Sequence, residues 1–469
     1  MFDLITDPEV IEGYLTDASN SKGWAEGLVR PSNAAEISEV LIECQRTSTP
    51  LTVTSQRTST TGGPVPNGGW LISMEKLTKI ISIDETTAVV EAGVLLGELQ
   101  TELESRGKLF PPDPTSRHEC SLGGAIACNA SGARSFKYGS IRSWIISVEA
   151  ILPTGEVVTA TRDTPIPTDW PKVEWNQPAV KCAAGFYSAD NLLDLIIGQE
   201  GALAIISRAT IKLTTPSESF FSIFALFNNE SDALDFVELI RDNPSNHPGV
   251  DPSLIEWFDR ACLELIRTSS QSFPTSGVAG VWCEQEVRAS ELDDSLEKWF
   301  DILERYNADL ECSIFAQDIR GHNELARLRH AIPAGINEQV VANKMTKVGT
   351  DCSVPNSALR DMMAEYKKAP MTSYLFGHIG DNHLHLNLLP KNDKELKLAK
   401  QFYKELCIKA IELGGSVSAE HGIGKLKREH LAEMVGQSTL NSFVALKRHL
   451  DPAWILGRGN VIAQSSNKS

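Results

Sequence analysis

The segment Thr52-Val-Thr-Ser-Gln-Arg-Thr-Ser-Thr-Thr-Gly-Gly-Pro-Val-Pro66 carries the strongest fold signal in the chain. It is a polar turn that follows a short apolar run, it is rich in hydroxyl groups, and it contains a glycine pair. Backbone N–H groups in such a turn can converge on a pyrophosphate, and serine or threonine hydroxyls can add donors. The turn therefore favours a chain that binds a nucleotide cofactor.

Small residues gather in a second region. They occur in the runs Pro111-Pro-Asp-Pro-Thr-Ser116, Ser121-Leu-Gly-Gly-Ala125, Cys128-Asn-Ala-Ser-Gly132 and Lys137-Tyr-Gly-Ser140. Such residues let a large flat cofactor lie close to the backbone, although glycine-rich loops are also common without one. The chain has no Gly-x-Gly-x-x-Gly after its first strand and no Gly-x-x-x-x-Gly-Lys-Ser/Thr. Neither a Rossmann fold nor a P-loop is therefore supported.

The composition is that of a soluble globular protein. With 469 residues, 42% of them apolar and 22% charged, the chain is expected to form two domains. It has no window of about eighteen unbroken apolar residues, and its start lacks the basic and apolar regions of a signal peptide. We expect a cytoplasmic protein without a transmembrane segment.

Charge and cysteine usage narrow the class further. A net charge of −17 disfavours nucleic-acid binding, and it requires a local cationic pocket for any anionic substrate. Nine cysteines are scattered singly, which indicates reduced thiols rather than disulfides or an iron–sulfur cluster. If the chain handles electrons, no cluster of its own receives them.

Hydrophobic patterning predicts two α+β units with a boundary near Thr215-Pro216-Ser217. The first unit has predicted strands at 51–54, 70–74, 80–83, 88–92 and 204–213, a hairpin at 147–160, and helices after Pro31 and at 94–106. Asn33 and Glu36 form a capping box for the first helix, and Gly107 closes the second. The second unit has a predicted strand at 220–227, helices at 231–241 and 292–306, and strand-like runs within 374–389.

Histidines concentrate in the second unit. The segment Gly377-His378-Ile-Gly-Asp-Asn-His-Leu-His385 is followed later by Ser418-Ala-Glu-His-Gly422. On a strand, His383, His385 and Asn387 share one face and the intervening leucines face the other. Because a turn separates His378 from this strand, His378 can return toward His385. A lone histidine is usually structural, but two imidazoles with a nearby carboxylate suit Zn²⁺, Mn²⁺ or Fe²⁺.

Cations that could meet an anionic substrate lie in two segments, Arg327-Leu-Arg-His-Ala-Ile-Pro333 and Lys344-Met-Thr-Lys-Val-Gly-Thr-Asp-Cys-Ser-Val-Pro355. Arg329 is the first choice, because a guanidinium group matches a carboxylate with two parallel hydrogen bonds. The alternative is that these residues are ordinary solvated charges.

Taken in order, these segments resemble the FAD-binding domain of the vanillyl-alcohol-oxidase/p-cresol-methylhydroxylase superfamily. Within it, the chain is similar to the branch of D-lactate dehydrogenase, D-2-hydroxyglutarate dehydrogenase and the glycolate oxidase catalytic subunit. The resemblance includes Val90-Glu-Ala-Gly-Val94, Gly198-Gln-Glu-Gly-Ala-Leu-Ala-Ile-Ile206 and Gly459-Asn-Val461, and so covers nearly the whole chain. It implies an α+β fold: a two-part FAD-binding domain of the p-cresol-methylhydroxylase type (1–215), then an α+β substrate (cap) domain with an antiparallel sheet (216–400). A C-terminal helical segment (401–469) would complete the active site and pack back on the FAD domain.

The resemblance also implies which residues contact FAD. They are Ser55, Arg57, Thr58, Ser59, Thr60, Gly62, Pro112, Asp113, Ser116, Gly123, Gly124, Asn129, Ser131, Gly132, Gly139, Glu200, Gly201, Ile205 and Ile206. The first loop departs from the family in having Ser55, Gln56, Arg57 and Ser59 where glycines are usual. That loop has no histidine for the covalent flavin link of the family, so non-covalent FAD is expected.

By the same resemblance, the metal ligands are His378, His385 and Glu420, with zinc expected first and manganese or iron as alternatives. Asn387, Arg329 and Lys347 fall where the substrate is met, and His421 falls at the catalytic base. Asn382-His383 stands where Gly-Asn is commoner in the family, and we expect His383 to be a neighbour of the ligands rather than a ligand.

The activity implied is FAD-dependent oxidation of a D-2-hydroxy acid to its 2-oxo acid. The metal would bind the substrate hydroxyl and carboxylate, His421 would take the hydroxyl proton, and the hydride would pass to flavin N5. Electrons would leave to a quinone, an electron-transferring flavoprotein or a cytochrome. Two alternatives are a non-catalytic FAD-carrying subunit of an electron-transfer complex, which need not keep the histidines, and a phenolic-alcohol oxidase of the same superfamily. The oligomeric state stays open, a homodimer being one option.

Overall fold

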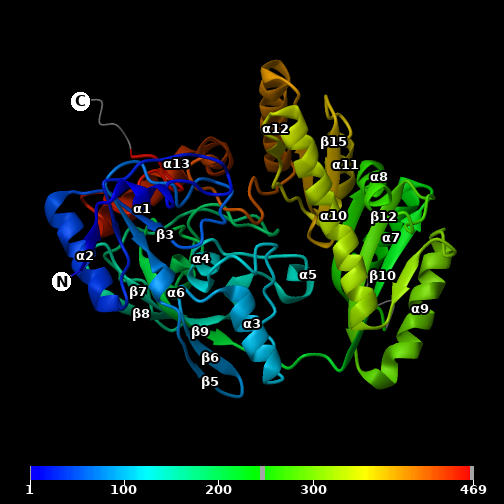
Figure 1. Ribbon diagram of the computed structural model, residues 1–469, viewed down its shortest axis with the longest axis horizontal. Helices are drawn as coiled ribbons and strands as arrows, with labels where there is room; N and C mark the ends of the chain where they lie inside the picture. Colours follow the sequence, from blue (N-terminus) through cyan, green and yellow to red (C-terminus); the bar gives the residue numbers. More distant parts are fainter. Residues whose placement is uncertain (1, 243–248, 465–469) are drawn as a thin grey trace.

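The computed structural model describes residues 2–242 and 249–464. Figure 1 shows two lobes, one formed by the N-terminal half together with α13 (Arg428–Leu450) and the other built around a large sheet. Helices lie beside sheets that are mainly antiparallel. The predicted α+β class is confirmed.

A four-stranded sheet leads into the hydroxyl-rich turn. In spatial order it consists of β1 (Leu4–Ile5), β2 (Gly27–Val29), β4 (Trp70–Ser73) and β3 (Leu51–Thr54). The predicted apolar positions of α2 (Ala34–Thr47) are buried against it. Asn33 accepts the N–H of Glu36 as predicted, but the Glu36 carboxylate accepts the N–H of Ser32 instead of closing a capping box on Asn33. Because β2, β4 and β3 are parallel, the turn leaves the carboxyl end of a parallel strand.

A five-stranded antiparallel sheet completes the N-terminal half. In spatial order it consists of β5 (Ile80–Ile83), β6 (Thr87–Glu91), β9 (Ile205–Lys212), β7 (Ile145–Ile151) and β8 (Val157–Thr161). The hairpin of β7 and β8 was predicted and is confirmed, with Ile151 paired to Val157. The helices of this half besides α2 are α1 (Pro8–Glu12), α3 (Leu96–Ser105), α4 (Leu122–Ala127), α5 (Ser135–Tyr138) and α6 (Leu192–Ile196).

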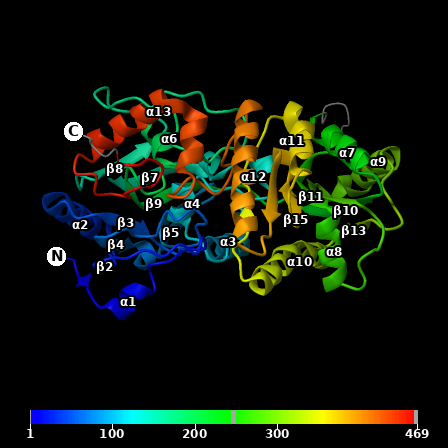
Figure 2. The same cartoon turned by 90° about the horizontal axis from the view of Figure 1, so that it is seen from above.

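A seven-stranded antiparallel sheet forms the second lobe. In spatial order it consists of β13 (Ile314–Ala316), β10 (Ser219–Phe227), β12 (Ala279–Val287), β11 (Pro252–Asp259), β15 (Ser373–His378), β16 (His383–Leu388) and β14 (Val348–Gly349). Its helices are α7 (Glu230–Asp242), α8 (Arg260–Ser269), α9 (Leu292–Arg305), α10 (Ile319–Asn343) and α11 (Leu359–Tyr366). Odd-numbered apolar residues of β10, such as Phe221, join one core cluster and even-numbered ones, such as Phe224, join another. The sheet is therefore covered on both faces, by α7 and α9 on one side and α8 and α10 on the other (Figure 2).

The C-terminal part of the chain returns to the N-terminal half. After α12 (Asp393–Glu412), the ring of Phe443 in α13 packs on Phe186 with centroids 5.1 Å apart. The buried Lys447 Nζ donates to the carbonyl of Ala202 at 2.6 Å. The predicted boundary near residue 215 falls between β9 and β10, and the division into 1–215, 216–400 and 401–469 stays a prediction.

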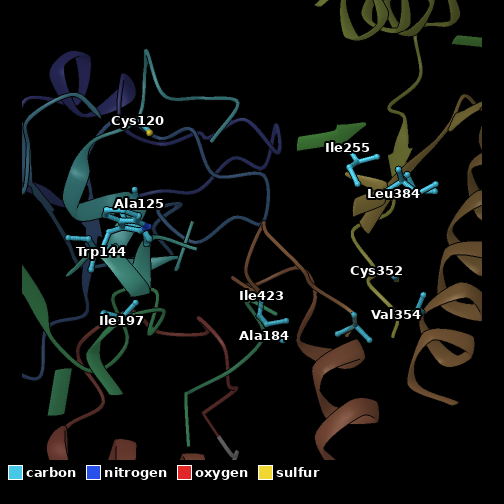
Figure 3. Packing of buried hydrophobic residues seen from close by; sticks show 14 of the residues in the cluster. Cys120, Ala125, Trp144, Ala184, Ile197, Ile255, Cys352, Val354, Leu384 and Ile423 are labelled. Carbon is cyan, nitrogen blue, oxygen red and sulfur yellow. The ribbon is translucent and has the colours of Figure 1, made fainter. Parts of the chain in front are cut away.

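One apolar cluster runs through both lobes. Figure 3 shows Ile423 beside Ala184 in one part of this cluster and Leu384 beside Ile255 in another. This shared packing positions the loop around residue 420 between the two lobes. Among the described residues, no helix has both the length and the apolar character needed to cross a bilayer.

Candidate active site and metal centre

Three imidazoles lie on one hairpin. β15 and β16 pair so that His378 stands opposite His383 and Phe376 opposite His385. The ring centroids of His378 and His383 are 5.4 Å apart, those of His383 and His385 4.4 Å, and those of His378 and His385 5.5 Å. The leucines that alternate with His383, His385 and Asn387 along β16, namely Leu384, Leu386 and Leu388, join the apolar core as predicted. Strand alternation thus gathers the imidazoles on one face.

Glu420 approaches this face from the loop before α13. Its Oε2 lies 3.4 Å from His378 Nε2 and 3.9 Å from His385 Nε2. Its other oxygen, Oε1, accepts hydrogen bonds from Lys181 Nζ at 2.8 Å and Ser131 Oγ at 3.2 Å. Ligand atoms of His378, His383, His385 and Glu420 all lie within 4.8 Å of one another. One carboxylate oxygen is therefore held in place by the protein while the other faces the imidazoles.

Each ring nitrogen that points away from the cluster has a partner. His378 Nδ1 is hydrogen-bonded to the Glu256 carboxylate, His383 Nε2 to Asp351 at 2.9 Å, and His385 Nδ1 faces the carbonyl of Thr350 at 3.3 Å. Such outer partners fix the tautomer and orientation of metal-binding histidines. His378 Nε2 and His383 Nδ1 are buried and have no hydrogen-bond partner. The donor set and these orphaned nitrogens fit a divalent metal.

The electrostatics of the cluster also favour a cation. Burial lowers the pKa of His378, but the Glu256 and Glu420 carboxylates outweigh it and raise that pKa to about 9. Burial holds the pKa of His385 well below its ordinary value, so this ring is neutral and its lone pair is available. A proton on His378 and a metal ion are alternative ways to supply positive charge here, since metal binding releases ligand protons.

Asp351 organises the loop that carries Glu420 and His421. Fully buried, it accepts hydrogen bonds from the backbone N–H of Glu420 at 3.2 Å and of His421 at 3.0 Å. It also accepts from Ser418 Oγ at 2.8 Å and Lys427 Nζ at 2.6 Å. Although burial raises it, the neighbouring cationic groups hold the pKa of Asp351 well below its ordinary value.

His421 lies beside the cluster of three histidines and Glu420. Its ring stacks on His385 with centroids 5.4 Å apart, and its Nδ1 lies 3.5 Å from Asp351 Oδ2. The side chain is 37% exposed, in contrast to the buried His378 and His383. An imidazole held by a carboxylate at Nδ1 offers Nε2 as a proton acceptor.

The predicted substrate cations differ in their surroundings. Arg329 lies on α10 over the ring of Phe376, and its Nε faces Glu256 Oε2 at 3.4 Å, so its charge is shared with the cluster. Lys347 precedes β14; burial lowers its pKa, and its Nζ has no ion-pair partner within residues 2–242 and 249–464. Asn387 stands opposite Gly349 in the adjacent strand. Of these two cations, Lys347 is thus the one whose charge has no ion-pair partner among the described residues.

The predicted cofactor residues all lie in the N-terminal half of the chain. Of these, Ser55 Oγ and Asn129 Oδ1 are buried without hydrogen-bond partners, as is Oγ1 of the neighbouring Thr54. A Cβ at Gly132 would lie 2.1 Å from the carbonyl oxygen of Asp113, so only glycine allows this approach. Orphaned polar atoms beside a glycine-lined backbone fit a bound dinucleotide.

Several residues predicted to contact FAD also have partners within the protein. The guanidinium of Arg57 lies 4.8 Å from the Tyr14 ring, and the Gly62 N–H donates to Asp17 at 2.9 Å. The Glu200 carboxylate accepts the N–H groups of Ile423 at 2.8 Å and Gly424 at 2.7 Å. The remaining predicted residues fall in four places: the loop 58–60, the segment 112–116, α4 with residues 131–139, and 201–206 leading into β9. Glu200 ties the predicted cofactor region to the loop of His421.

Sequence reasoning missed Asp351, Glu256 and Lys181. Glu256 had a signal, because it is a charged residue in the otherwise apolar stretch Leu254-Ile-Glu-Trp-Phe258. Asp351 lies in the segment 344–355, where the lysines are the residues that suggest a substrate contact. Nothing local marked Lys181, whose partner Glu420 is 239 residues away.

The fold brings together orphaned polar atoms and close glycine approaches in one half and a histidine–carboxylate centre in the other. This combination is the one expected of an FAD-dependent oxidoreductase. Residues 25–161 match the FAD binding domain family, and residues 217–461 match the family of FAD linked oxidases, C-terminal domain. The chain belongs to the FAD-linked oxidases, within the vanillyl-alcohol-oxidase/p-cresol-methylhydroxylase superfamily, which confirms the predicted resemblance and FAD as cofactor.

Relatives that match nearly the whole of this chain support the family assignment. Glycolate oxidase subunit GlcD of Bacillus subtilis is 28% identical over 97% of this chain and 93% of its own length. D-lactate dehydrogenase of Anaerostipes hadrus is 28% identical over 98% and 94%. The mitochondrial D-2-hydroxyglutarate dehydrogenase of Arabidopsis thaliana is 26% identical over 98% and 79%. A solved alkyldihydroxyacetonephosphate synthase shares the fold, with a TM-score of 0.70 at 18% identity over 97% of this chain and 82% of that one.

Proposed function

We propose that this chain oxidises a D-2-hydroxy acid to the corresponding 2-oxo acid, with a divalent metal held by His378, His385 and Glu420. The observation that supports this most strongly is the convergence of these ligand atoms within 4.8 Å, directly beside His421. Relatives named for glycolate, D-lactate and D-2-hydroxyglutarate support the substrate class. A non-catalytic subunit would have no need of this centre.

The residues divide the work of the reaction. Lys347 and Arg329 attract the substrate carboxylate, and the Asn387 amide lies on the same strand as His385. A divalent metal in this centre supplies Lewis acidity that lowers the pKa of an alcohol. His421 Nε2 takes the hydroxyl proton while Asp351 keeps the ring oriented through Nδ1. FAD, when bound, supplies the two-electron acceptor for the hydride from the substrate carbon, and an external acceptor then receives the electrons.

Flavin reduction tests this function directly. Purified protein is mixed without oxygen with D-lactate, D-2-hydroxyglutarate or glycolate, and the visible flavin absorbance is followed. We expect at least one of the three acids to bleach the flavin. The L-enantiomers of the chiral acids should leave it oxidised. Oxidised flavin with all three acids would overturn the proposal, and bleaching by a phenolic alcohol alone would favour the other branch of the superfamily.

The metal is tested by His385→Ala. This change removes one imidazole from the cluster, so metal content and turnover should fall together, and both should be measured on the same sample by elemental analysis and flavin reduction. His322→Ala is the matched control, because His322 also pairs with a buried carboxylate, Glu284 at 3.0 Å, but lies outside the cluster. Full turnover in metal-free His385→Ala protein would contradict a catalytic metal.

A further inference from the structure

We propose that His383 is a third imidazole ligand of the metal, so that three histidines and Glu420 hold the cation. This inference rests on the metal of the proposed function and extends its ligand set. It also reverses the expectation from sequence, in which His383 was only a neighbour of the ligands.

The first support is the position of the ring. His383 follows the turn directly and occupies the same strand face as His385, with its centroid 4.4 Å from that of His385 and 5.4 Å from that of His378. It is fully buried, so no solvent competes for its nitrogens. Its ligand atom belongs to the group that lies within 4.8 Å. The ring therefore belongs to the same group of candidate ligands as His378, His385 and Glu420.

The second support is the hydrogen bonding of the two ring nitrogens. His383 Nε2 is 2.9 Å from Asp351 Oδ1, and because a carboxylate only accepts, this nitrogen carries the proton. The neutral ring then has a lone pair on Nδ1, which is buried and has no partner. The same arrangement occurs at His378, where Glu256 holds Nδ1 and Nε2 is the buried orphan. A carboxylate behind a histidine whose other nitrogen is unsatisfied is the pattern of a metal ligand.

The third support is that the competing carboxylate, Asp351, already accepts hydrogen bonds on both of its oxygens. Asp351, His385 and His421 also come within 4.8 Å of one another, so Asp351 could be considered a ligand instead. A carboxylate offers about four lone-pair sites, and the Asp351 oxygens already accept from His383, Ser418, Lys427 and two backbone N–H groups. Both Asp351 oxygens are therefore already engaged by donors of the protein, and Asp351 serves as the outer partner of the ligand His383.

The imidazole count at the metal tests the inference. The apoprotein is prepared with a chelator, reloaded with Zn²⁺, and examined by X-ray absorption at the zinc edge, which counts imidazole ligands independently of activity. We expect three imidazoles in the unaltered protein and two in His383→Asn, whose amide can still donate to Asp351. The affinity for Zn²⁺ in chelator competition should fall at least 10-fold, on the order of the 10–100-fold loss seen even for outer partners of metal ligands.

The outcomes separate the two proposals. His322→Asn, the matched control, should keep three imidazoles and the original affinity. Two imidazoles in the unaltered protein would overturn the role of His383 while leaving the metal of the proposed function in place. Failure of the unaltered protein to bind Zn²⁺, Mn²⁺ or Fe²⁺ would overturn both. The count in the unaltered protein decides the question even if His383→Asn does not fold.

Discussion

Replacing His421 by alanine should slow reduction of the flavin by the hydroxy acid about 10²–10⁴-fold, the usual contribution of a general base. His421 stacks on His385 and is the most exposed imidazole of the cluster, so among the described residues it is the ring best placed to take the hydroxyl proton. FAD should stay bound, because the substitution leaves the predicted contacts Ser55 and Asn129, with their orphaned polar atoms, unchanged. Rapid mixing with substrate, followed at the visible flavin band, measures the effect.

Two controls separate loss of a base from loss of structure. Metal and flavin content of His421→Ala should equal those of the unaltered protein, since Glu420 keeps its partners Lys181 and Ser131. Imidazole added to the solution should restore part of the lost rate in the variant and should leave the unaltered protein unchanged. A variant that reduces its flavin at the original rate would contradict the role of His421 as base.

The local parts of this site could be predicted from sequence because their geometry is set over a few residues. His378, His383 and His385 lie within one hairpin, and a period of two fixes which side chains share a face. Glu420 and His421 are adjacent, so one residue that reaches the metal brings the next into range. Strand and helix positions such as β7, β8 and α2 followed from the same short-range patterns.

The supporting residues could not be predicted because their partners are far along the chain. Glu256 meets His378 through the pairing of β11 with β15, and Lys181 meets Glu420, which is 239 residues away along the chain. A single buried charge leaves no periodic signal, and only its place in an apolar run marked Glu256. Glu200 shows the converse: the family resemblance assigns it to the cofactor, and the fold also uses its carboxylate to hold the backbone of residues 423 and 424.

Replacing Asp351 by asparagine should lower the free energy of unfolding by about 3–5 kcal/mol, the cost of breaking a buried ion pair by removing one partner. Lys427 would keep its charge in a buried position 2.6 Å from a neutral amide. Urea unfolding followed by tryptophan fluorescence measures the loss. Turnover should also fall, because Oδ1 accepts from Glu420 and Oδ2 from His421, and an amide offers one oxygen and one NH₂ in their place.

The double variant Asp351→Asn with Lys427→Met separates these two effects. Removing both charges of a buried pair is often nearly neutral for stability, so most of the lost unfolding free energy should return. In either orientation of the amide that replaces the Asp351 carboxylate, its NH₂ group faces one of the two backbone N–H donors, those of Glu420 and His421. The loop therefore stays misplaced. Turnover should therefore remain about 10–100-fold below that of the unaltered protein, as expected for a lost outer partner of a metal site. Recovery of full turnover together with stability would show that Asp351 serves only to neutralise Lys427.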